Sequence, residues 1–391
     1  MKNTLRKVVA WLAVLLACAL ATGCWSATEL GQLAIVMGIG VDAGSTPGSY
    51  LLTAQLARPS QANSFPAQQG PGSKPYLNVQ MEGLGVNAAL HEMTRQMSRK
   101  LYTAHNQVLV LGGDVAGDTI VPVLNYFIRS AEGKFAVRLL IAEGKADGLL
   151  REDAGLEQLP AMHLKNLLHS GIDNIYVEDT TLHSFLSELL IPGIAATAPL
   201  VSLYTDADGV NRAQVQGSAI FLEGRQIGVL SVERTQAKQL VQGRTKGGYV
   251  HLDAFGNDLS LDITASHTTV TARVEDGRVV AAIHVRQEYT LADTGAETGV
   301  SRKETIAEIE EIAATRIVAA VEDLIRYTQG FGADVCGLGD MARRKYPEQM
   351  KPLLENWPAN YANLEVEVIA VTRVVMTGAT LRSISPGGGR P

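Results

Sequence analysis

The chain has 391 residues, with 40 acidic and 34 basic side chains and a formal net charge of −6. Removing an N-terminal leader that holds Lys2, Arg6 and Lys7 would change the charge to −6 − 3 = −9, which argues against a surface for nucleic acid or anionic lipid. Aromatic residues make up only 5% of the sequence, which disfavours a lectin that stacks sugars on rings.

The first 24 residues predict a lipoprotein signal peptide. A basic start precedes an apolar run from Val8 to about Leu20, and Ala-Thr-Gly leads into Cys24. The Leu lies one position further from Cys24 than is usual. A rival site at Cys18 follows the bulky Leu16 and leaves a shorter apolar run. We predict removal of residues 1–23 and a lipid on Cys24; an ordinary cleaved signal or a retained membrane anchor are the alternatives.

The mature chain is long enough for two or three domains. No apolar run after residue 24 approaches the length of a membrane-spanning helix. If Cys24 is acylated, Cys336 is the one remaining cysteine, so no intramolecular disulfide is expected.

Residues 24–150 alternate between strand and helix patterns, which predicts an N-terminal mixed α/β domain. A segment rich in Pro, Gly, Gln and Ser, residues 58–78, predicts a mobile loop. The predicted strands are 33–41, 50–57, 107–111 and 136–142, and the predicted helices are 86–101 and 119–129.

Residues 151–210 show short helical patterns and predict a small helical middle domain that ends at the turn Asp206–Gly209. Residues 211–385 predict a C-terminal domain with an antiparallel sheet packed on a long helix, so the fold class is multi-domain α+β. Glu223-Gly224 and Asp276-Gly277 are hairpin signals. The predicted elements are strands 215–221, 226–232, 258–266, 268–275, 279–289 and 364–377, a helix from a capping box at Ser301 and Glu304 to Gly330, and a helix over 341–355.

No segment carries a convincing catalytic, metal or cofactor pattern. Gly38, Gly40 and Ala43 fit a relaxed dinucleotide fingerprint, but a strand follows them where a helix would have to start. The histidines lack zinc spacing, and His105, just before a predicted strand, is the only one we single out. The sequence therefore predicts no enzyme, no cofactor and no metal.

Several segments follow one another in the order of a known family. The first is Cys24-Trp25 with Glu29-Leu30 and 33–36 through 40–42, and the second is 105–112 with 125–129. The third is 217–221 with 227–230 and Glu233, and the last is 333–337 with 343–345, Trp357 and the closing strand up to Gly378. Together they resemble the Ger(x)C lipoproteins, the C subunits of spore germination receptors. The chain departs from the family at Ser26-Ala27-Thr28, where a charged run is usual.

The resemblance implies three mixed α/β domains on a lipid anchor at the outer face of the inner spore membrane. It implies a complex with an integral-membrane A subunit and a transporter-like B subunit that responds to nutrients. Contact positions that we would test are Arg129, Glu233 and Arg343. The alternatives are a solute-binding lipoprotein of a transporter, which sparse aromatics and unlike halves argue against, and an extracytoplasmic hydrolase, which lacks any triad or metal spacing.

Overall fold

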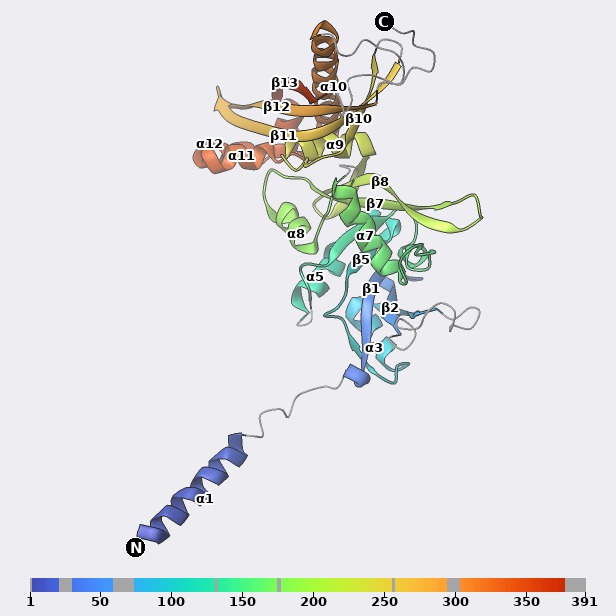
Figure 1. Ribbon diagram of the computed structural model, residues 1–391, viewed down its shortest axis with the longest axis vertical. Coiled ribbons are helices and arrows are strands. Elements are labelled where there is room, and N and C mark those ends of the chain that lie inside the picture. Colours follow the sequence, from blue (N-terminus) through green and yellow to red (C-terminus); the bar gives the residue numbers. More distant parts are fainter. Residues whose placement is uncertain are drawn as a thin grey trace, which may run out of the picture.

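The computed structural model describes residues 2–20, 30–58, 74–130, 133–173, 177–254, 257–293 and 303–376. Helix α1 (Lys2–Leu20) covers most of the predicted signal segment, and Cys24 and Ser301 lie outside the described residues. Among the described helices, none combines the length and the apolar character needed to cross a bilayer. The rest forms two sheets with helices packed on them (Figure 1), which confirms the α+β class.

The larger sheet has nine strands. Eight lie in the order β3-β2-β1-β5-β6-β7-β8-β9, and β4 pairs with the start of β1. The centre, β1-β5-β6-β7, is parallel, and the strands on either side are antiparallel. The bounds are β1 (Leu33–Ala43), β2 (Ser49–Ala57), β3 (Tyr76–Leu84), β4 (Lys100–Tyr102), β5 (Val108–Leu111), β6 (Arg138–Ala142), β7 (Ala196–Thr205), β8 (Asn211–Leu222) and β9 (Arg225–Leu230).

Helices cover both faces of this sheet. One face packs on α3, α4, α5 and α8, and the other face packs on α6 and α7. The parallel strands are continuous apolar runs because both of their faces are buried. The bounds are α3 (Val86–Thr94), α4 (Gly113–Asp118), α5 (Val121–Arg129), α6 (Ala146–Leu149), α7 (Pro160–Asp173) and α8 (Leu182–Leu190).

The predicted strands of this region are confirmed, but two local predictions were wrong. The helix predicted over 86–101 ends at Thr94, and Leu101 is buried from β4, whose backbone pairs with β1. Leu101 fits the helical period by coincidence. The segment predicted as loop up to residue 78 already enters β3 at Tyr76, since β2 supplies it with backbone partners.

The larger sheet runs through the positions at which we predicted domain boundaries. β7 and β8 form a hairpin across 210/211, with Leu200 opposite Gly217. Helix α7, which lies within the predicted helical middle domain, packs against β5 and β1. The sheet and its helices therefore form one packed unit from β1 to β9.

Both predicted tight turns are confirmed by left-handed backbone angles. Glu223 and Gly224 have φ values of 51° and 80°, and Asp276 and Gly277 have 49° and 75°. Two successive residues with positive φ match the right-handed twist of the flanking strands, which is why hairpins favour Asp-Gly at these positions.

The smaller sheet has the order β10-β11-β12-β13. The sheet is antiparallel from β10 to β12, but the strands predicted over 258–266 and 268–275 are one continuous strand, β11. β13 runs parallel to β12 and not antiparallel as predicted, because helices carry the chain back to the same end of the sheet. The bounds are β10 (Tyr249–Ala254), β11 (Asn257–Glu275), β12 (Arg278–Asp293), β13 (Glu365–Met376), α9 (Val232–Val241), α10 (Lys303–Gln329), α11 (Leu338–Lys345), α12 (Pro347–Leu354) and α13 (Trp357–Ala362).

Helices α9 and α10 lie on one face of the smaller sheet (Figure 1). None of the described helices covers the other face, and Ile369 and Val371 on β13 are exposed there. The long helix is confirmed as α10, but the helix predicted over 341–355 is two helices, because Pro347 starts a new one. Helix α9 and strand β10 were not predicted.

Candidate functional site

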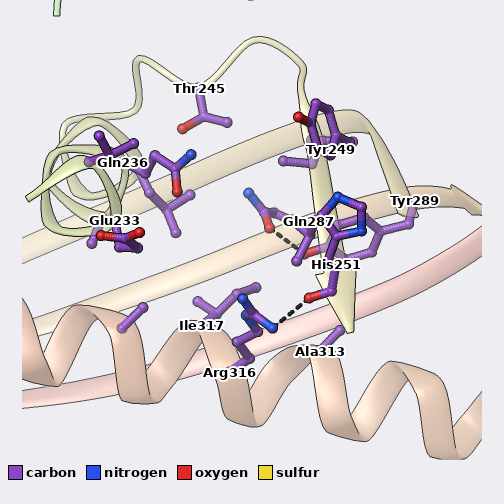
Figure 2. Close-up of a pocket in the computed structure, with 16 residues that line it drawn as sticks. Glu233, Gln236, Thr245, Tyr249, His251, Gln287, Tyr289, Ala313, Arg316 and Ile317 are labelled. Atoms are coloured by element: carbon purple, nitrogen blue, oxygen red, sulfur yellow. Dashed lines mark hydrogen bonds between the residues drawn. The ribbon is translucent and has the colours of Figure 1, made fainter. Parts of the chain in front are cut away.

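A cavity of about 310 Å³ lies between α9, α10 and the smaller sheet (Figure 2). The loop that joins α9 to β10 closes one side of it, and α10 runs along the opposite side. Its lining residues are Val232, Glu233, Gln236, Ala237, Leu240, Thr245, Tyr249, Val250, His251, Ile263, Gln287, Tyr289, Ala313, Arg316, Ile317 and Ala320.

The floor of the cavity is built by buried polar groups of β12. The Tyr289 hydroxyl donates to Gln287 Oε1 over 2.5 Å, and Gln287 Nε2 donates to Ser266 Oγ over 3.1 Å. Burial raises the pKa of the Tyr289 phenol, while the nearby Arg316 guanidinium acts in the opposite direction. The phenol is therefore neutral at physiological pH and holds its hydrogen bond.

Arg316 supplies a cation at the rim. Its guanidinium Nη1 donates to the backbone oxygen of His251 over 2.5 Å and so ties α10 to β10 (Figure 2). The imidazole of His251 meets the ring of Tyr249 edge-on, with centroids 5.2 Å apart. Among the described residues, no carboxylate lies within ion-pair distance of Arg316.

Glu233 supplies an anion at the rim, and the start of α9 engages it. Its own backbone N–H and the Ser231 hydroxyl lower the pKa of the Glu233 carboxyl. Ser231 also accepts the Arg234 N–H as the N-cap of α9. The carboxylate thus completes the cap of its helix.

Thr245 is the one lining residue with a buried hydroxyl that finds no partner in the part of the chain that the structure describes. It lies in the loop before β10, is 6% exposed, and faces the cavity from the side opposite α10 (Figure 2). A buried hydroxyl without a hydrogen bond costs about 1–3 kcal/mol, so this group can accept or donate a bond to a bound molecule.

The face of α9 that looks away from the cavity holds a buried ion pair. Lys238 is 0% exposed, and its ammonium donates to Glu178 Oε1 over 2.5 Å and to the Thr197 hydroxyl. The other Glu178 oxygen accepts hydroxyl bonds from Thr197 at 2.7 Å and from Ser218 at 3.2 Å. Because Thr197 and Ser218 belong to β7 and β8, this pair fastens α9 to the larger sheet.

Two acidic and two basic side chains, Glu178, Glu188, Lys238 and Arg244, lie close together around this pair. Burial opposes ionisation of Glu178, but Lys238, the Thr197 hydroxyl and Arg244 together lower its pKa. Glu188 has a raised pKa, chiefly through burial, and lies 3.9 Å from Arg244. The arrangement is a fully hydrogen-bonded junction, in which each partner compensates for the burial of the other.

The predicted contact residues lie on three separate elements. Arg129 is exposed at the end of α5, and Glu233 lies on the cavity rim. Arg343 on α11 is paired with Asp340 at 2.5 Å, and Arg344 contacts the same carboxylate. The structure does not bring these three residues together, and Cys24 lies outside the described residues.

The weaker sequence signals have structural roles. Gly38, Gly40 and Ala43 lie within β1, so no helix starts at the fingerprint. His105 is exposed and meets the ring of Tyr102 edge-on at 5.4 Å. Cys336 is buried, and burial, followed by the charge of Asp334, raises the pKa of its thiol, so a thiolate is not available there at neutral pH.

Within the described residues, no group of three or more His, Cys, Asp and Glu side chains could hold a metal ion. The sequence missed the cavity itself. Helical spacing alone puts Arg316 on the polar face of α10, and it does not distinguish solvent from a cavity rim. Lys238 and Thr245 offered no pattern, since their environment depends on contacts far away in the sequence.

Two family models match the chain in order. The spore germination protein N-terminal domain matches residues 26–203, and the C-terminal domain described as spore germination B3/GerAC-like matches residues 216–378. Together they cover nearly all of the described sheets and helices.

Curated proteins of Bacillus subtilis (strain 168) are similar over most of the chain. Putative spore germination protein YfkR is 24% identical, with 98% of this chain and 100% of that protein covered. Spore germination protein KC is 23% identical, with 95% and 96% covered. The crystal structure of the GerBC protein has the same fold, with a TM-score of 0.58, 18% identity, and 89% of this chain and 100% of that chain covered.

Proposed function

Because this chain belongs to the Ger(x)C family of spore germination proteins, we propose that it is the lipid-anchored C subunit of a nutrient germinant receptor. The observation that carries the proposal is the ordered match of both family domains, which begins two residues after Cys24 and continues to residue 378. The lipid on Cys24 would hold the protein at the outer face of the inner spore membrane, and its partners would be the integral-membrane A and B subunits.

The proposed action is protein–protein contact without catalysis. Within the part of the chain that the structure describes, the buried carboxylate of Glu152 pairs with His163 and has a structural role, since Glu152 Oε2 also accepts the backbone N–H of Ala213. The rival role as a solute-binding lipoprotein would call for two similar lobes, whereas the two sheets here have nine and four strands in unrelated orders.

Anchoring is tested with Cys24→Ala. Two acyl chains suffice to hold a protein on a bilayer, with about 0.8 kcal/mol for each buried methylene, so their loss should move the protein from the membrane to the soluble fraction of lysed spores. Cys18→Ala is the matched control because it changes the rival cysteine only, and it should leave the protein on the membrane. A Cys24→Ala protein that stays with the membrane would contradict the anchor.

The receptor role is tested by deletion and by co-purification. Deleting the gene should abolish the germination response to at least one nutrient while spores stay viable, and the A subunit should co-purify with the tagged chain. Arg129→Ala, Glu233→Ala and Arg343→Ala would each lower recovery of the A subunit if these residues form the contact; unchanged recovery for all three would remove them. A chain that recovers neither subunit would contradict the proposal.

A further inference from the structure

We propose that the cavity between α9, α10 and the smaller sheet is a binding site for a small carboxylate that has an apolar body and a hydroxyl or carbonyl group at its far end. The volume of about 310 Å³ lies in the range of cavities that enclose small organic molecules. The inference does not rest on the receptor role, because it uses only the chemistry of the lining.

The charge of the lining selects an anion. Glu233 completes the cap of α9, and Lys238 and Glu178 neutralise each other behind that helix. Glu233, the anion on the rim, is held by the start of α9, whereas Arg316 has the backbone oxygen of His251 as its partner and meets no carboxylate among the described residues. Arg316 is therefore the lining group that can bind an added anion, and a guanidinium matches the two oxygens of a carboxylate.

The walls select an apolar body. The cavity is lined by apolar side chains from three elements, namely Ala237 and Leu240 of α9, Ala313 and Ile317 of α10, and Ile263 of β11. Tyr289 and Gln287 hydrogen-bond each other on the floor, so these groups need no bond from a ligand. A body that buries apolar surface here gains about 25 cal/mol per Å².

Thr245 favours a polar group at the end of the ligand that lies away from the carboxylate. Its hydroxyl is buried without a partner and lies on the wall opposite Arg316 (Figure 2). A ligand whose carboxylate meets Arg316 would place its other end toward this hydroxyl, where a hydroxyl or carbonyl group would complete the bond that the protein leaves unmade.

The test uses 4-hydroxyphenylacetate, its amide, tyramine and phenylacetate, titrated by calorimetry against the full chain in lipid nanodiscs, with empty nanodiscs subtracted. The acid should bind with a dissociation constant on the order of 1 mM, given its small size. The amide and tyramine should bind about tenfold more weakly or worse, since neither offers a carboxylate to Arg316. The affinity of phenylacetate should lie between that of 4-hydroxyphenylacetate and those of the amide and tyramine.

Variants locate the site. Arg316→Gln should weaken the acid about tenfold and abolish its advantage over the amide, whereas Arg326→Gln, an exposed arginine of α10 outside the cavity, should change binding less than about twofold. Ala320→Phe at the exposed rim should block all four molecules. Thr245→Val should remove the advantage of 4-hydroxyphenylacetate over phenylacetate.

No measurable binding of the acid, equal binding of acid and amide, or binding that survives both Arg316→Gln and Ala320→Phe would each overturn the proposal. None of these outcomes would alter membrane anchoring or co-purification with the A subunit, so a failure here is distinct from a failure of the receptor role.

Discussion

The two sheets of this protein are buried in different ways. The larger sheet has apolar clusters on both faces and helices over each of them. The smaller sheet buries one face against α9, α10 and the helices that follow, while its other face is exposed along β11, β12 and β13. The larger sheet is therefore enclosed between two layers of helices, whereas the smaller sheet has a cavity on one face and an exposed surface on the other.

The two regions use their buried polar groups for different purposes. Between layers that are packed on both sides, polar groups serve as fasteners, as at Glu178 and Lys238. Beside the smaller sheet, the helices and the loop before β10 leave a cavity unfilled. Polar side chains that line it, such as Thr245 and Arg316, can bind a ligand. Three changes would break or sharpen this contrast.

The largest expected effect is in the larger sheet's core. Phe185 is fully buried and meets Phe221 edge-on at 5.3 Å, so Phe185→Ala should lower the free energy of unfolding of this region by about 5 kcal/mol. Val371→Ala on the open face, where the side chain is 55% exposed, should cost less than about 0.5 kcal/mol. Hydrogen exchange resolved by region measures both, and equal losses would contradict the contrast.

The next effect is at the junction of the two regions. Lys238→Ala leaves the Glu178 carboxylate buried without its cation, which should cost about 4 kcal/mol. Because the pair fastens α9 to β7 and β8, urea unfolding followed by exchange should show the two regions melting separately. Arg244→Ala is the control: its side chain is 48% exposed, and its loss should cost under about 1 kcal/mol. A single unchanged transition in Lys238→Ala would argue against the fastening.

The smallest of the three effects is a pH dependence within the smaller region. Asp334 accepts the backbone N–H groups of Gly337 and Gly339 at 2.8 and 2.7 Å, yet burial raises its pKa to about 6 from 3.8. The folded state therefore binds a proton that the unfolded state releases between these values. The contribution to stability is full below about pH 4 and falls by about 3 kcal/mol as the pH rises through 6.

Urea unfolding from pH 3.5 to 7 measures that slope, and Asp334→Asn should flatten it because the amide does not titrate. Asp42→Asn is a useful comparison: Asp42 also has a raised pKa and accepts backbone N–H groups, from Ala146 and Asp147, but in the larger sheet. Equal slopes in the parent chain and Asp334→Asn would contradict the assignment to Asp334.

Much of the fold follows from local patterns in the sequence. β-branched runs and Asp-Gly or Glu-Gly turns locate most strands, and isoleucine spacing locates α10. Helix α9 was missed because several of its buried positions are polar, among them Thr235, Lys238 and Gln239. These side chains are buried by bonds to residues 17 to 62 positions away, which no local period reveals.

The direction of β13 and the cavity were also out of reach of sequence patterns. An alternating strand reads the same whether its neighbour is parallel or antiparallel, and the helices after β12 decide which. The cavity depends on two helices, three strands and a loop that meet in space, so the roles of Arg316 and Thr245 became visible only once α9, α10 and β10 were placed together.

The hairpin of β7 and β8 has a consequence for folding during synthesis and export. As the chain emerges from a ribosome or a translocation channel, residues 196–205 arrive first and present an open edge. That edge is closed only when residues 211–230 follow, although these largely belong to the second family domain. The larger sheet therefore cannot be completed until β8 and β9 have emerged. A chain released after residue 205 would expose an unpaired apolar strand edge, which promotes aggregation.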